Sequence, residues 1–328
     1  MLVLKVLVTG AAGHVGKHLI PALLAKNYGV RVAVLNAEEA REAFKDAPLE
    51  IMELDLGSAE QPAFDTIAKG VDAVVHMAAV GVVNSSIGRE KIFAVNVEAT
   101  KKLLRACKKS DGFKRFVFIS SSALYHHPFR LPIEESDVPS PGNAYGESKV
   151  AAEQAVRESG VPFVILRPVV IYGLGFEPAF APIVKAIQKQ KLPIIGEGDT
   201  HFPVVHVDDL VNAILLSLEK SEAVGEAFNI SGEALTQKQW VEAVADELGV
   251  PAPKRRIPVW LAEAMVLFYE LKGKLFGGKS AISRDSVRRL TTDRVFSTKK
   301  AERALGWKAR VSPRDGLSEI IASILAKK

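Results

Sequence analysis

The feature that most constrains the fold is a glycine-rich turn that directly follows a short apolar run. Residues 2–8, LVLKVLV, predict a buried strand, and residues 9–16, TGAAGHVG, join this strand to a predicted helix. The GxxGxxG spacing gives each glycine a mechanical task. Gly10 permits a tight turn, Gly13 lets a ligand approach the backbone, and Gly16 lets the helix pack close to the strand. Free amides at the N-terminus of such a helix bind phosphates, so the turn predicts a phosphate site.

Strand-like and helix-like segments then alternate along the first half of the chain. We predict further strands at 30–35, 49–54, 72–77, 115–119 and 162–166, and helices at 37–45, 91–109 and 144–159. This alternation predicts an α/β fold, a Rossmann-type doubly wound parallel sheet with helices on both faces. Ligands of such sheets bind beyond the carboxyl ends of the strands. The residues at those predicted ends include Asp55, Ala78, Ala79, Ser121 and Pro168.

A second pattern places a phenol and an ammonium one helical turn apart. Tyr145 and Lys149 lie four residues apart in the predicted helix 144–159, so their side chains share one face. A free phenol has a pKa of about 10, and a nearby ammonium favours the phenolate. Tyr145 could then accept a proton from an alcohol during oxidation, or donate it during reduction. A serine of the run 120–122 could orient the substrate oxygen.

These motifs resemble the extended short-chain dehydrogenase/reductase family, which is similar to NAD-dependent epimerases and dehydratases and includes a hydroxysteroid dehydrogenase and dihydroflavonol reductase branch. They follow the family order over about two thirds of the chain. The matching segments are TGAAGHVG, Asp55, HMAA at 76–79, NVEAT at 96–100, SSSALY at 120–125, YGESK at 145–149, RPVVIYG at 167–173 and VHVDDL at 205–210. Two residues depart from the pattern, since Ala99 and His126 stand where the family usually has glycine.

The resemblance implies an NAD(P)-dependent enzyme with a catalytic triad of Ser121, Tyr145 and Lys149, with Ser122 as the alternative serine. It also implies that Lys149 holds the nicotinamide ribose and that Asp55 meets the adenine. The full set of residues expected at the NAD or NADP cofactor is Gly10, Ala12, Gly13, His14, Val15, Gly16, Asn36, Asp55, Leu56, Ala78, Ala79, Asn96, Tyr145, Lys149, Pro168 and Val170. His14 could face a phosphate or only fill the turn.

Cofactor choice is expected to depend on Asn36, at the end of the second predicted strand. An aspartate there would bond the ribose hydroxyls and repel a 2′-phosphate. Asparagine carries no charge, and Arg41 is the nearest downstream cation for such a phosphate. The sequence therefore predicts weak discrimination between NAD and NADP.

The C-terminal half is expected to form a smaller, mostly helical substrate domain. We place the dinucleotide domain at 1–170, with a returning segment near 203–232, and the substrate domain at 171–328. Helices are predicted at 178–190, 209–219, 236–248 and 259–276, and a loop and strand at 193–205. Asp208 and Asp209 are expected to cap the second of these helices, and His206 to pack. The apolar segment 259–277 is expected to be a buried core helix, with a substrate lid or a membrane-surface contact as alternatives.

The substrate class is predicted from two positions that are polar in nucleotide-sugar enzymes of the family. Val170 stands where such enzymes often carry asparagine, and Phe202 where they often carry arginine. A diphosphate buried against these side chains would leave its charge unpaired. The sequence therefore predicts hydride transfer to or from an apolar ketone or secondary alcohol. A nucleotide-sugar epimerase or dehydratase with tightly bound NAD is the alternative, and a non-catalytic dinucleotide sensor is the third hypothesis.

Composition limits the other partners. The net charge is +5, and no basic stripe with interleaved aromatics predicts nucleic-acid binding. The single cysteine, Cys107, cannot form an internal disulfide, which fits a reducing, cytoplasmic location. Charged residues within 259–277 argue against a membrane span, and we expect no metal. The helices at 91–109 and 144–159 resemble those that pair across a two-fold axis in the family, which implies a homodimer.

Overall fold

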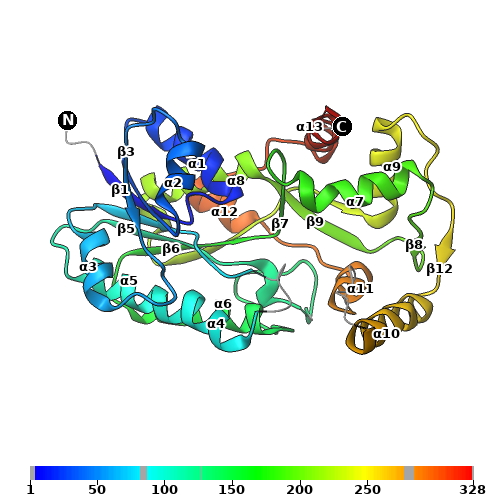
Figure 1. Ribbon diagram of the computed structural model, residues 1–328, viewed down its shortest axis with the longest axis horizontal. Helices are drawn as coiled ribbons and strands as arrows, with labels where there is room; N and C mark the ends of the chain where they lie inside the picture. Colours follow the sequence, from blue (N-terminus) through cyan, green and yellow to red (C-terminus); the bar gives the residue numbers. More distant parts are fainter. Residues whose placement is uncertain (1–3, 82–86, 127, 277–283, 327–328) are drawn as a thin grey trace.

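A seven-stranded parallel sheet forms the centre of the larger part of the molecule (Figure 1). The computed structural model describes residues 4–81, 87–126, 128–276 and 284–326. The strand order is β10-β6-β5-β4-β1-β2-β3, and every neighbouring pair is parallel. The strands are β1 (Lys5–Thr9), β2 (Gly29–Val34), β3 (Leu49–Glu53), β4 (Ala73–His76), β5 (Arg115–Ile119), β6 (Phe163–Pro168) and β10 (Glu226–Ile230). The Rossmann-type doubly wound sheet that the alternation predicts is confirmed.

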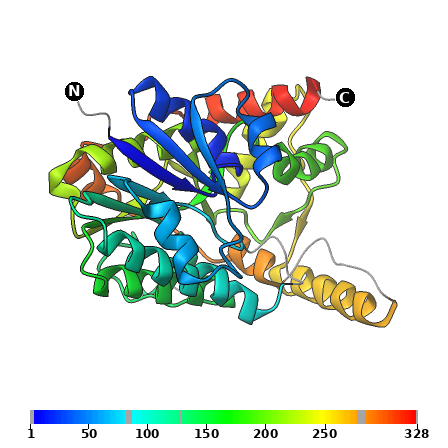
Figure 2. The same ribbon diagram turned by 60° about the vertical axis from the view of Figure 1, so that its left-hand side comes forward.

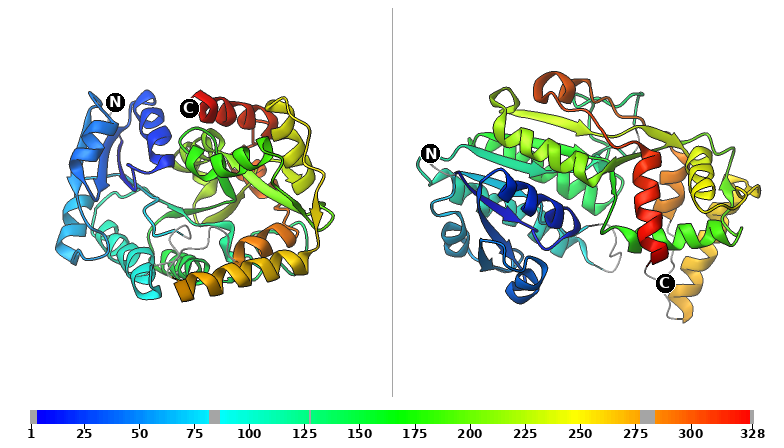
Figure 3. Two further views of the ribbon diagram at one scale, coloured as in Figure 1. Left: turned by 45° about the vertical axis from the view of Figure 1, so that its right-hand side comes forward. Right: turned by 90° about the horizontal axis from the view of Figure 1, so that it is seen from above.

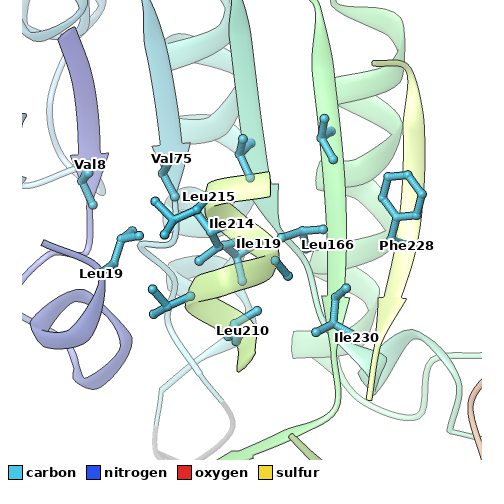
Figure 4. Packing of buried hydrophobic residues seen from close by; sticks show 14 of the residues in the cluster. Val8, Leu19, Val75, Ile119, Leu166, Leu210, Ile214, Leu215, Phe228 and Ile230 are labelled. Carbon is cyan, nitrogen blue, oxygen red and sulfur yellow. The ribbon is translucent and has the colours of Figure 1, made fainter. Parts of the chain in front are cut away.

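Helices cover both faces of this sheet, because most of its strands are apolar runs with side chains buried on either side. One face is covered by α1 (His14–Ala25), α2 (Ala37–Ala43), α8 (Val207–Glu219) and α12 (Lys299–Leu305). The other is covered by α3 (Gln61–Ala68), α5 (Ala99–Lys108) and α6 (Ala144–Glu158). Figure 4 shows Leu210, Ile214 and Leu215 of α8 lying over the strand side chains of the first face. Helix α3 was not predicted from the sequence.

The long helix predicted at 91–109 is divided into three pieces. It consists of α4 (Arg89–Phe93), a π-helical turn η1 (Ala94–Glu98) and α5. A π-turn adds a residue to the helical repeat and often marks a functional position. Here it contains Asn96, whose buried side chain faces the end of the sheet. The prediction of one regular helix was therefore wrong at this turn.

The smaller part of the molecule lies beyond the carboxyl end of β6, from which β7 (Val170–Tyr172) continues directly (Figures 1 and 3). It contains a three-stranded sheet of β7, β9 (His201–His206) and β11 (Ala234–Thr236), and a short pair of β8 (Ile194–Ile195) and β12 (Arg256–Ile257). The three-stranded sheet packs against three helices and forms a separate hydrophobic core with them. These helices are α7 (Glu177–Gln188), α9 (Gln237–Glu247) and α13 (Pro313–Ala326). Short 3₁₀ turns are η2 (Ser122–Leu124) and η3 (Ser221–Ala223). The helical C-terminal region is as predicted, and its small sheets are additional.

The cap of α8 differs from the prediction. His206, and not Asp208 or Asp209, is the N-cap residue, and its Nδ1 accepts a hydrogen bond from the amide of Asp208 at 3.3 Å. Asp209 is buried, and its carboxylate accepts the amides of Arg310 and Val311 at 2.9 and 3.2 Å. A carboxylate engaged with a distant backbone segment is not available to cap its own helix. His206 packs as expected.

The apolar segment 259–277 also departs from the prediction. It forms α10 (Val259–Phe276), which packs on α11 (Arg284–Thr291) and projects from the body of the molecule (Figure 2). Ala262 and Val266 are buried, but the side chains of Trp260 and Phe268 are 67% and 64% exposed. Over residues 259–268, whose side chains are described, only one side of α10 meets the rest of the chain, so the expectation of a buried core helix was wrong for this stretch. Residue 277 lies outside the described residues.

Candidate active site

The glycine turn lies against the end of β4, and two of its glycines have no room for a side chain. Gly10 has a φ of +75°, and a Cβ there would lie 2.8 Å from the amide nitrogen of Ala78. A Cβ at Gly16 would lie 2.0 Å from the carbonyl oxygen of Ala11. The tight turn expected at Gly10 is therefore present, and at Gly16 helix α1 lies close to the backbone of the turn residue Ala11.

The first turn of α1 has the properties of a phosphate site. Gly13 is the N-cap residue and provides no side-chain hydrogen bond, and the first turn contains no acidic residue. The leading amides of the helix therefore lack a capping side chain and can bind an anion. Ala12 and Val15 are half-buried and pack towards the sheet. His14 is exposed, with its ring centroid 4.7 Å from that of Phe176 in the loop before α7.

A chain of hydrogen bonds fixes the ends of β1 and β4. The amide of Ala78 donates to Thr9 Oγ1 at 3.2 Å, and Thr9 Oγ1 lies 2.7 Å from His76 Nδ1. On the other side of the ring, His76 Nε2 lies 2.9 Å from Thr100 Oγ1, which donates to the carbonyl of Asn96 at 2.8 Å. Burial lowers the pKa of His76 to about 3, so its ring is neutral and each ring nitrogen has one partner. Sequence reasoning did not assign a role to His76.

Asn96 holds the loop that follows Ala78 and Ala79. Its Oδ1 accepts the amide of Val80 at 2.8 Å, and its Nδ2 donates to the carbonyl of Val80 at 3.1 Å and to Ser148 Oγ at 2.9 Å. The amide group thus links this loop to α6, the helix that carries Tyr145 and Lys149. These bonds give Asn96 a positioning role beside its expected place in the cofactor site.

The three expected catalytic residues converge at the end of β5. Lys149 is buried, and its Nζ donates to the carbonyl of Ile119 at 2.8 Å and lies 5.8 Å from the ring centroid of Tyr145. The Ser121 side chain hydrogen-bonds the phenol of Tyr145, which is half-buried. Ser122 is buried in the turn η2 instead. Of the alternatives left open by the sequence, the geometry therefore favours Ser121.

The electrostatics of this group differ from the expectation. Burial raises the pKa of the Tyr145 phenol, and the hydrogen bond from Ser121 opposes that rise. Burial also lowers the pKa of Lys149 to about 8, against the attraction of Glu153. The expectation that Lys149 lowers the pKa of Tyr145 below its usual value is wrong for the protein alone. The free energy needed to remove the Tyr145 phenolate from water is larger than the stabilisation that the neighbouring groups provide.

Asn36 and Asp55, at the far edge of the sheet, both accept hydrogen bonds from local backbone. Asn36 is the N-cap of α2, and its Oδ1 accepts the amides of Glu38 and Glu39 at 2.9 and 3.1 Å. Asp55 accepts the amide of Gly57 and the hydroxyl of Ser58, each at 2.9 Å, and these bonds lower its pKa. Both residues are exposed after strand ends, where an adenosine would lie.

The remaining residues expected at the cofactor are Leu56, Pro168 and Val170. The last two lie on either side of the connection from the seven-stranded sheet to the three-stranded sheet. Leu56 is half-buried against the second face of the large sheet. Pro168 ends β6 and is buried, whereas Val170 begins β7 and is half-buried. The residues predicted from the sequence thus follow the ends of six strands, β1 to β6, and the sheet order brings β1, β4, β5 and β6 side by side.

A buried ion pair behind the site was not predicted. Arg167 of β6 donates to both carboxylate oxygens of Glu153 on α6, with Nε–Oε1 at 2.9 Å and Nη2–Oε2 at 2.6 Å. Both side chains are buried, and Arg167 Nη1 also donates to the carbonyl of Glu135 at 3.0 Å. Glu153 lies four residues after Lys149 and therefore on the same face of the helix. This spacing is the signal in the sequence that could have placed Glu153 near the catalytic residues. The pair fastens the catalytic helix to the sheet.

Comparison with known proteins agrees with this arrangement. The model of the NAD dependent epimerase/dehydratase family matches residues 6–231. A UDP-glucose 4-epimerase of Vibrio cholerae is 28% identical, over 98% of this chain and 95% of that protein. A 3 beta-hydroxysteroid dehydrogenase/Delta 5→4-isomerase of Mycobacterium tuberculosis H37Rv is 27% identical, over 97% and 89%.

Among solved structures, the Bordetella bronchiseptica enzyme WbmG in complex with NAD is 27% identical and superposes with a TM-score of 0.76, over 99% of this chain and 94% of that one. The fold is therefore shared along nearly the whole chain. Because the family model covers more than half of the residues, this chain belongs to the NAD dependent epimerase/dehydratase family.

Proposed function

We propose that this protein is an NAD-dependent epimerase that acts on a secondary alcohol carbon of a nucleotide sugar. The observation that carries the proposal is the convergence of Ser121, Tyr145 and Lys149 at the end of β5, beside the strands that present the glycine turn. The UDP-glucose epimerase relative, which aligns along almost the whole chain, supports the substrate class. This revises the preference for an apolar alcohol that Val170 and Phe202 suggested.

The residues of the turn fit a dinucleotide. Side chains at Gly10 and Gly16 would clash with backbone, and the uncapped first turn of α1 can accept a pyrophosphate. NAD, when bound, accepts a hydride from the substrate carbon and can return it. Glu53 revises the weak discrimination between NAD and NADP that Asn36 suggested, and favours NAD, because its Oε2 accepts the amide of Ala37 at 3.0 Å, next to Asn36. A carboxylate at that strand end would repel a 2′-phosphate.

The side chains perform the proton transfer. Tyr145 Oη accepts the proton of the substrate hydroxyl while its carbon loses hydride, and returns the proton in the reverse step. Ser121 orients the substrate oxygen towards Tyr145 and its hydrogen bond favours the phenolate. Lys149, whose Nζ lies 5.8 Å from the ring centroid of Tyr145, would hold the nicotinamide ribose. An epimerase completes both half-reactions on opposite faces of the ketone, so it makes no net reduced cofactor. A dehydrogenase with the same residues releases one reduced cofactor for each alcohol oxidised.

Val170 and Phe202 are weaker evidence for an apolar substrate than the sequence suggested. Val170 and Phe202 both pack partly against the core of the smaller part, and the ring centroid of Phe202 lies 6.2 Å from that of Trp240. Their apolar character therefore serves this core. Because this packing accounts for their apolar side chains, the two positions do not exclude a nucleotide sugar.

Oxidation of an apolar alcohol is the second candidate function. The hydroxysteroid dehydrogenase relative favours it, as does the exposed apolar side of α10. The two functions use the same triad and differ in their products, so one experiment separates them.

The test is to incubate the protein with NAD and a panel of UDP- and dTDP-sugars, and separately with a 3β-hydroxysteroid. Epimer formation followed by proton NMR, with no stoichiometric absorbance of reduced cofactor, is the expected result, and the Tyr145→Phe variant is the matched control. Accumulation of reduced cofactor with the steroid alone would favour the second candidate. NAD binding without turnover of any substrate would favour a dinucleotide sensor and contradict both.

A further inference from the structure

Exposed apolar side chains gather on α10. Among the described residues, thirteen large apolar side chains are exposed, and five of them come from the ten residues 259–268. Trp260, Ala264, Leu267 and Phe268 follow the i, i+4, i+7, i+8 spacing, so they form one stripe along the helix. We call these four residues the α10 stripe. Glu263 is exposed at the edge of this stripe and lines the same surface hollow as Trp260, Ala264 and Arg288. The opposite side holds Ala262 and Val266, which pack with Val287 of α11.

The segment of sequence that contains this stripe also carries the excess positive charge of the chain. Residues 254–289 contain nine lysines and arginines and three acidic residues, a net charge of +6, whereas the whole chain carries +5. The remainder of the protein is thus nearly neutral. Among the side chains that the structure describes in this segment, Lys254 and Arg255 are exposed before α10, and Arg288 is exposed on α11. An apolar stripe with basic flanks is the pattern of a helix that lies in a membrane interface.

We propose that α10 docks the protein on an anionic lipid bilayer. The α10 stripe enters the boundary between headgroups and acyl chains, and the basic flanks lie over anionic headgroups. No helix in the described part of the chain is long and apolar enough to cross a membrane, so the contact is peripheral. A second copy of the chain fits less well, since pairing two stripes would bring two segments of charge +6 together. This inference goes beyond the proposed function and does not rest on it.

The three tryptophans of the sequence allow a direct measurement. Trp240 and Trp307 are 8% and 1% exposed, whereas Trp260 is 67% exposed. A blue shift of tryptophan emission on addition of phosphatidylglycerol vesicles therefore reports Trp260 entering an apolar medium. We expect this shift together with co-sedimentation of the protein. Phosphatidylcholine vesicles should bind less, and added salt should release the protein from phosphatidylglycerol. The Trp260→Phe variant should still sediment without the shift.

Matched variants distinguish binding through the α10 stripe from nonspecific hydrophobic adsorption to the vesicles. Trp260→Glu combined with Phe268→Glu should lower partitioning onto phosphatidylglycerol vesicles about tenfold or more, because both changes place a charge in the interface. Val224→Glu combined with Leu325→Glu alters two apolar residues that are 42% and 38% exposed elsewhere, and should bind as the wild type does. Lys254→Glu combined with Arg255→Glu should weaken binding to phosphatidylglycerol only. Circular dichroism and thermal melting check that each variant folds.

Three results would overturn the proposal. They are absence of wild-type sedimentation with phosphatidylglycerol, equal binding to both lipids, and unchanged binding of the Trp260/Phe268 variant. A fourth result would show that a second copy of the chain covers the α10 stripe. If light scattering without lipid shows a wild-type dimer that this variant converts to a monomer, the α10 stripe is a subunit interface and not a membrane contact.

Discussion

Tyr145 is half-buried with its hydroxyl bonded to Ser121 and with Lys149 beneath its ring. We expect Tyr145→Phe to lower turnover roughly 10²–10⁴-fold, the usual range of general acid–base catalysis. NAD binding should stay within a few-fold, since the lost hydroxyl faces the substrate. Steady-state turnover with fluorescence titration of NAD measures both quantities.

The control for this change is Tyr28→Phe, which removes a hydroxyl from a half-buried tyrosine at the end of α1 and should leave turnover unchanged. Near wild-type turnover in Tyr145→Phe would remove Tyr145 from the mechanism. Loss of NAD binding in the same variant would point to a damaged fold instead.

His76 makes stability depend on pH. Its folded pKa is lowered to about 3 by burial, whereas the unfolded histidine titrates near 6.5. Between these values the unfolded chain binds one proton more, so stability falls as the pH drops through this window, at roughly 1.4 kcal/mol per pH unit. We expect His76→Asn to flatten the dependence of the unfolding free energy on pH between 4 and 6. Urea unfolding at several pH values measures this slope, and an unchanged slope would show that other groups dominate.

Cofactor preference is expected to depend on Glu53. Its carboxylate lies next to Asn36 at the ends of β2 and β3, so we expect NAD to bind more tightly than NADP. Glu53→Gln keeps an acceptor for the amide of Ala37 and removes the charge, and should raise NADP affinity while NAD affinity changes little. Asn36→Asp should shift the preference further towards NAD. Titration of both cofactors checks this, and tighter binding of NADP by the wild type would contradict it.

At the scale of elements, α6 is fastened to β6 by the buried pair of Glu153 and Arg167. Removal of one partner of such a pair leaves an uncompensated buried charge and costs roughly 3–5 kcal/mol. We expect Glu153→Gln to lower the unfolding free energy by about that amount, measured by urea denaturation. The exposed Glu158→Gln on the same helix should change it by less than about 1 kcal/mol. Equal effects of the two changes would show that the pair does not stabilise the fold.

Elements were predicted well where the pattern is local. The apolar runs of β1 to β6 and the helical spacing of α6 are properties of short segments, and the structure confirms them. The π-turn around Asn96 was missed because it depends on bonds to Val80 and Ser148, which come from other elements. The short helix α3 was missed between two strands, although its apolar side meets the sheet.

At the scale of the whole molecule, we still expect a homodimer built from the helices near 91–109 and 144–159. A two-fold contact would place α5 and α6 of each copy in a four-helix arrangement. Light scattering at micromolar concentration should give about twice the mass of one chain. The Trp260/Phe268 double variant should leave that mass unchanged, because the dimer contact lies on other helices. A monomeric wild type would contradict the expectation.

The sequence by itself determined the strand–turn–helix unit at TGAAGHVG, the parallel sheet and the shared face of Tyr145 and Lys149. Spacing and backbone preference act within a few residues, so these features can be read from a short segment. Only the tertiary structure selected Ser121, placed His76 between Thr9 and Thr100, and paired Glu153 with Arg167.

The tertiary structure also decided what is buried, and burial set the chemistry. It raised the pKa of Tyr145 and left the apolar stripe of α10 exposed. An apolar run states only that a segment can be buried. Whether it is buried depends on which distant elements pack against it, and for α10 one side is covered and the other is not.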